Sequence, residues 1–112
     1  DKIKEDNLVK EAIAALDLTL KAERASSKTS ELRMKIESNP KDMASRQELA
    51  IALYGAGEIE GALDCLLDSI NFDRNWNEEA ARKQLVEFFS AIGLQDPIVV
   101  SARKRLSSIL FR

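Results

Sequence analysis

Two helical runs joined by a very short linker constrain the fold of this chain more than any other feature. In LAIALYGAGEIEGALDCLL, residues 49–67, apolar residues recur three or four positions apart on both sides of Gly55-Ala56-Gly57-Glu58. That spacing is typical of amphipathic helices. Glycine readily adopts the left-handed conformation that ends a helix, so we expect Gly57 to end the first one. Such a short linker allows only an antiparallel helical hairpin.

The residues before this hairpin predict two more helices. Apolar residues follow one stripe over 5–24, which indicates an amphipathic helix. The polar run 26–30 predicts a break, because serine and threonine side chains bond to nearby backbone and favour loops or caps. A short helix then ends at Ser38, because Pro40 disfavours helix at Asn39.

Capping signals divide the rest of the chain. Asp42, Asn77 and Asp96 are the predicted N-caps. Glu78 and Glu79 suit the positive end of the helix that Asn77 caps, and proline at the first helical position suits the last helix. The predicted helices are 43–56, 58–72, 78–92 and 97 to the C-terminus.

The hairpin resembles the tetratricopeptide repeat, a helix–turn–helix pattern with a period of about 34 residues. With Gly57 at the turn, the signature positions hold Arg46, Leu49, Ala50, Leu53, Ala62, Leu66 and Arg74. Five of the seven are suitable apolar residues, whereas both arginines depart from the pattern. Ala50 and Ala62 would lie where the two helices cross, so a larger side chain there would push them apart.

A second, degenerate unit follows the first. Leu85 takes the place of Leu49 and Gly93 that of Gly57, a spacing of 36 residues (85 − 49). We therefore predict an all-α domain of antiparallel helical hairpins, a tetratricopeptide-like superhelical array of about six helices. Within 1–112 its parts are N-terminal helices over 1–38, the best-matching repeat over 39–76 and the degenerate hairpin over 77–112.

Composition argues against several function classes. The chain has no histidine and a single cysteine, Cys65, which excludes Ser-His-Asp triads, Cys-His dyads and histidine-ligated metals within it. We expect no enzyme, no cofactor and no metal, and a structural role for Cys65. The net charge of −2 gives no basic field for nucleic acid, and no apolar run reaches the roughly 20 residues of a membrane helix.

A longer motif resembles one bacterial family. The run DRNWNEEAARKQL at 73–85, followed by Phe88-Phe89, Gly93, Asp96-Pro97 and RLSSILF at 105–111, is similar to thioredoxin-like chaperones of the chaperedoxin or YbbN type. The similarity covers about 39–111 well and the N-terminal helices loosely. It implies that this chain is the C-terminal tetratricopeptide domain of a longer protein with an N-terminal thioredoxin-fold domain. Cys65 does not correspond to the thioredoxin motif.

That resemblance implies a cytoplasmic holdase or co-chaperone. It would keep unfolded client proteins soluble and pass them to the chaperonin or the Hsp70 system, with any redox chemistry in the thioredoxin domain. The alternative is a structural or self-association domain, a homo-oligomer that binds no client.

The first helix of each repeat usually lines the concave face of such an array. In this register the concave residues are Ala44, Gln47, Ile51, Tyr54, Lys83 and Glu87. Ile51 and Tyr54 would offer an apolar patch to a partner, unless the helices of 1–38 cover them. Gln47 and Ile51 stand where Hsp90-binding repeats place the lysine and asparagine of their carboxylate clamp, so we expect no acidic peptide tail to bind that way.

Two further features are candidate contact sites. The last helix is locally basic through Arg103, Lys104, Arg105 and Arg112. It is either a docking helix, as the resemblance suggests, or a solvated face near a helix C-terminus. Nucleic-acid contact is disfavoured by the acidic balance. Trp76 is either a partner hot spot or a packing residue in the joint between the hairpins.

Overall fold

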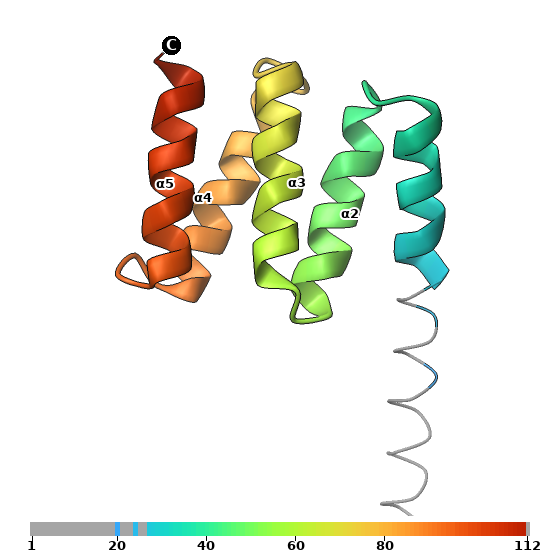
Figure 1. Ribbon diagram of the computed structural model, residues 1–112, viewed down its shortest axis with the longest axis horizontal. Coiled ribbons are helices and arrows are strands. Elements are labelled where there is room, and N and C mark those ends of the chain that lie inside the picture. Colours follow the sequence, from blue (N-terminus) through green and yellow to red (C-terminus); the bar gives the residue numbers. More distant parts are fainter. Residues whose placement is uncertain (1–19, 21–23, 25–26, 112) are drawn as a thin grey trace, which may run out of the picture.

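The computed structural model describes residues 20, 24 and 27–111, and every regular element in that part of the chain is a helix (Figure 1). A helix over 27–38 is followed by α2 (Met43–Gly55), α3 (Ile59–Phe72), α4 (Ala80–Ile92) and α5 (Pro97–Leu110). In Figure 1 successive helices run in opposite directions, and α4 lies behind α3 and α5, so that α3 also contacts α5. The predicted all-α array of helical hairpins is confirmed, with five helices in the described part rather than about six.

The expected break at 26–30 is wrong over its described residues. Residues 27–30 belong to the helix that runs on to 38. Its Leu32 is buried in the core, and Lys28 pairs with Glu48 of α2 at 3.7 Å between Nζ and Oε2. Packing against α2 thus outweighs the weak helix propensity of serine and threonine. The predicted helix over 5–24 lies outside the described residues except at Leu20 and Arg24, which are helical.

Local capping signals are confirmed at two helices. Asp42 accepts hydrogen bonds from the Ser45 backbone N–H at 3.1 Å and from the Ser45 hydroxyl at 2.7 Å. The hydroxyl bond, then the backbone bond, lowers the pKa of the Asp42 carboxyl. Asp96 accepts from the Ile98 N–H at 2.9 Å, with Pro97 as the first residue of α5. Gly57 has φ +86°, which only glycine adopts without strain.

The predicted start of α4 is wrong. Asn77 does not cap a helix that begins at Glu78, because α4 begins at Ala80. Asn77, Glu78 and Glu79 instead have φ values of 47°, 57° and 62°, all in the left-handed region. The Ala80 N–H donates to the Trp76 carbonyl at 3.2 Å and closes this turn. Three consecutive left-handed L-residues are strained, because each places Cβ close to a carbonyl oxygen.

This turn predicts that Glu78→Gly stabilises the domain. A left-handed L-residue costs roughly 1–2 kcal/mol, and glycine at this position would remove that strain. Part of the gain in stability is lost, because glycine has more conformational freedom in the unfolded chain. We expect a net gain of about 1 kcal/mol in the free energy of unfolding, measured in urea. Glu87→Gly within α4 is the control and should lose about 1 kcal/mol. Equal losses in both variants would mean that the turn is not left-handed in solution.

The core joins all five described helices. Its buried residues come from 27–38 (Leu32), α2 (Leu49, Ala50, Leu53), α3 (Ala62, Leu63, Leu66, Leu67, Ile70), α4 (Ala81, Leu85, Phe88, Phe89) and α5 (Val99, Ala102). Ala52, between the buried Ala50 and Leu53 of α2, is only partly buried. Helix α3 is central, because it contacts α2, α4 and α5.

Candidate functional site

The predicted concave residues of α2 lie on one stripe, and two of them contact α4. Gln47, Ile51 and Tyr54 are spaced four and three positions apart, which places them on the same side of the helix. Gln47 Nε2 donates to the Ala80 carbonyl at 3.3 Å. The Tyr54 ring stacks on Phe88, with centroids 4.2 Å apart and planes 8° apart. We call this surface of α2 and α4 the α2–α4 face.

Ile51 remains open on this face. It is 50% exposed, although its neighbours on the stripe are partly buried. Ala44, Lys83 and Glu87 are exposed as well. The described part of the N-terminal region therefore does not cover the face. The apolar patch expected from Ile51 and Tyr54 is mainly Ile51, because the tyrosine ring is engaged by Phe88.

The side-chain oxygen of Gln47, Oε1, is buried without a hydrogen-bond partner in the described part of the chain. The side-chain nitrogen, Nε2, donates to the Ala80 carbonyl. A buried acceptor without a donor costs free energy, so native proteins contain few of them. The α2–α4 face thus includes one unsatisfied acceptor beside its half-exposed apolar residue.

The small residues lie inside the hairpin. Ala50 and Ala62 have no solvent exposure. Gly61 lies one residue before Ala62, and a Cβ added there would meet Leu53 Cδ1 at 3.4 Å. Ala50 and Ala62 are thus fully enclosed in the hairpin, whereas a methyl group at Gly61 would make only an ordinary contact with Leu53.

Trp76 lies in the turn between α3 and α4. Its side chain is partly buried, and its backbone N–H donates to the Asp73 carbonyl at 3.3 Å. Its carbonyl accepts the bond from Ala80 that closes the left-handed turn. Trp76 therefore belongs to the joint between the two hairpins.

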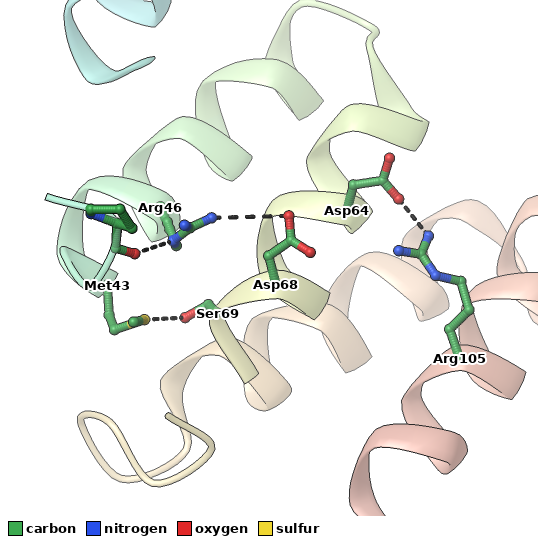
Figure 2. A network of polar contacts seen from close by, with 7 residues as sticks. Met43, Arg46, Asp64, Asp68, Ser69 and Arg105 are labelled. Atoms are coloured by element: carbon green, nitrogen blue, oxygen red, sulfur yellow. Dashed lines mark hydrogen bonds and ion pairs between the residues drawn. The ribbon is translucent and has the colours of Figure 1, made fainter. Parts of the chain in front are cut away.

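The two arginines that depart from the repeat signature form contacts that spacing did not reveal. Arg46 donates from Nε to the Pro40 carbonyl at 2.9 Å, and its Nη1 lies 3.9 Å from Oδ2 of Asp68 (Figure 2). The Arg46 guanidinium also lies over the Phe72 ring, 4.6 Å from the ring centroid. A flat guanidinium can stack on an aromatic ring as an aromatic side chain does. Arg74 donates to the Leu110 carbonyl at 3.4 Å. These arginines tie α2 to α3, and the turn after α3 to the end of α5.

The basic residues of α5 separate into two kinds. Arg105 pairs with Asp64 of α3 (Figure 2), so it is used within the domain. Arg103 and Lys104 are exposed, and no described residue pairs with Arg103. Arg112 lies outside the described residues. Of the predicted docking helix, only Arg103 and Lys104 are exposed without an ion pair in the described part of the chain, and the sequence alone did not distinguish them from Arg105.

Cys65 and the acidic residues of the described part are candidates for reactive or metal-binding groups. Burial raises the pKa of the Cys65 thiol, which disfavours the reactive thiolate. The described residues contain no group of three or more cysteine, aspartate or glutamate side chains that could hold a metal. None of the described helices is both long and apolar enough to pass through a membrane.

Comparison with known families supports the repeat architecture. A family model for the tetratricopeptide repeat matches residues 22–111, most of the chain. Comparisons with curated proteins and with solved structures gave no match, so the narrower resemblance to thioredoxin-like chaperones stays a prediction. Tetratricopeptide domains generally mediate protein–protein interactions. The matched range contains both hairpins and the helix before them, and this chain belongs to the tetratricopeptide repeat family.

Proposed function

We propose that this domain is the protein-binding module of a bacterial, cytoplasmic, thioredoxin-like co-chaperone or holdase. It holds unfolded clients, or a chaperone partner, on the α2–α4 face. The observation that carries the proposal is Ile51, which is half exposed between two residues that fix α2 to α4. The resemblance of the run at 73–85 to chaperedoxins supports the co-chaperone role.

The composition of the α2–α4 face suits clients without a fixed sequence. Ile51 offers apolar contact, while the exposed Lys83 and Glu87 of α4 offer charges of both signs. Gln47 Oε1 is buried, so it is not available to a client, and the Gln47 side chain serves this face by bonding the Ala80 carbonyl. Apolar contacts are independent of client sequence. Because few residues carry the binding energy, affinity should be modest.

Ile51→Asp tests this proposal. A charge at the centre of the face removes the apolar contact, so we expect the variant to lose most of its suppression of client aggregation, followed by light scattering of a chemically unfolded protein. Tyr54 is left unchanged, because its ring stacks on Phe88 and its loss would disturb the fold. The control is Val100→Asp, which introduces the same charge at a 39% exposed apolar residue of α5.

The comparison between the two variants decides the outcome. Suppression that survives in Val100→Asp and fails in Ile51→Asp supports client binding on the α2–α4 face. Equal suppression by both variants, or none by the wild type, contradicts it. A wild-type dimer that Ile51→Asp dissociates, measured by sedimentation, would instead support the self-association alternative.

A further inference from the structure

The second hairpin has an open apolar groove on another face. Helices α4 and α5 enclose a volume of about 260 Å³, lined by Val86, Phe89, Leu94, Arg103 and Leu106 together with two serines. Val86 is 46% exposed and Leu94 is 56% exposed. Exposed apolar residues gathered in a groove are typical of interaction sites. We call this surface the α4–α5 groove.

The first hairpin shows what covers the corresponding surface. The 36-residue spacing that relates Leu49 to Leu85 also relates Leu53, Leu67 and Ile70 to Phe89, Arg103 and Leu106. Leu53, Leu67 and Ile70 are all at most 2% exposed and share a core with α4. They are covered because the second hairpin packs on α3 through both of its helices. In the second hairpin Phe89 is still buried, but Arg103 is exposed and Leu106 is only partly buried.

One substitution between the two hairpins changes the chemistry of this surface. Leu67, which is fully buried, corresponds to Arg103, which is exposed and has no described partner. The next residue, Lys104, is exposed and adds a second positive charge. The apolar floor formed by Phe89 and Leu106 is thus bordered by cations. An occupant must therefore supply apolar side chains and at least one negative charge.

We propose that the α4–α5 groove binds an amphipathic α-helix of a partner protein, with a carboxylate opposite Arg103. A helix fits because helices cover the equivalent surface of the first hairpin. The carboxylate fits because an arginine replaces a buried leucine at the edge of the groove. This site lies on a different face from Ile51 and stands independently of client binding there.

A pair of designed peptides tests the groove. Both are about 16 residues long, because shorter isolated helices are marginal in water, and both carry leucines at helical spacing. One has glutamates beside the leucine stripe and the other has lysines in their place. We expect the acidic peptide to shift the backbone NMR signals of Val86, Leu94 and Leu106, and to bind roughly fivefold tighter than the basic one, as an exposed ion pair allows.

Charge reversal in the protein is the decisive variant. Arg103→Glu should exchange the preference, so that the basic peptide binds more tightly. Val86→Asp should abolish binding of the acidic peptide, whereas Val100→Asp on the same hairpin should retain it. Circular dichroism of each variant checks that the fold is intact.

Four results would overturn the proposal. Two concern the wild type, namely signal shifts confined to the α2–α4 face and no binding of either peptide. The third is an unchanged peptide preference in Arg103→Glu. The fourth is a wild-type dimer that Val86→Asp dissociates, which would identify a second copy of this chain as the occupant.

Discussion

Phe88→Ala is expected to lower the free energy of unfolding by about 3–5 kcal/mol. Phe88 is buried in the shared core and stacks on Tyr54, so its removal leaves a cavity where the two hairpins meet. Small domains are stable by only about 5–15 kcal/mol, so this single change removes a large part of the total. Urea unfolding followed by circular dichroism should show a lower midpoint with little change in slope.

A phenylalanine elsewhere in the chain provides the matched control. Phe111 is 83% exposed, and Phe111→Ala should change the free energy of unfolding by less than about 0.5 kcal/mol. The stack itself is isolated by a double-mutant cycle of Tyr54→Leu and Phe88→Leu, with an expected coupling of about 1 kcal/mol. A Phe88→Ala loss no larger than that of Phe111→Ala would mean that α4 does not hold α2 through this contact.

Local signals in the sequence predicted the elements that depend on near neighbours. Asp42 caps α2 through Ser45, three residues away, and Asp96 caps α5 through Ile98, two residues away. Gly57 follows the end of α2 with a positive φ, which depends on the residue type at that one position. Such features need no knowledge of the rest of the fold, which is why a single sequence was sufficient to place them.

Features that depend on distant residues were not predicted. Tyr54 and Phe88 are 34 positions apart (88 − 54), and Arg46 and Phe72 are 26 apart (72 − 46), yet each pair is in direct contact. Helical periodicity identifies the face on which a residue lies but not its partner across the core. Tyr54 was therefore assigned to a partner's surface, although the second hairpin already engages it.

The left-handed turn at 77–79 was missed for a different reason. Asn77 followed by Glu78 and Glu79 predicts an N-cap with acidic residues in the first helical turn, which is the favoured pattern at a helix N-terminus. Nothing in the two glutamates favours positive φ. The turn forms because Trp76 and Ala80 are held at the joint between the hairpins, so packing overrides the local preference.

The candidate site was likewise predicted only in part. Helical spacing predicted that Gln47, Ile51 and Tyr54 share one side of α2, but it did not predict the contacts of Gln47 and Tyr54 with α4.

Ala62→Leu is expected to destabilise the domain by about 1–3 kcal/mol. Ala62 has no solvent exposure and belongs to the core on α3, the helix that packs on α2. Because protein interiors are close-packed, we expect the added carbon atoms of leucine to separate the two helices or to force side chains out of their preferred rotamers. Urea unfolding gives the energy, and the midpoint should fall although leucine is a good helix former. The loss would therefore come from packing and not from helix propensity.

Gly61→Ala on the same helix separates these two causes. A Cβ at Gly61 would meet the end of the Leu53 side chain at 3.4 Å, which is ordinary contact. Alanine there should raise the free energy of unfolding by about 0.5–1 kcal/mol, because glycine is a poor helix residue. If Ala62→Leu also stabilised the domain, the hairpin would have spare volume, and the alanines would not be required at the crossing. If Ala62→Leu destabilises while Gly61→Ala stabilises, packing at Ala62, and not helix propensity, is the constraint on this hairpin.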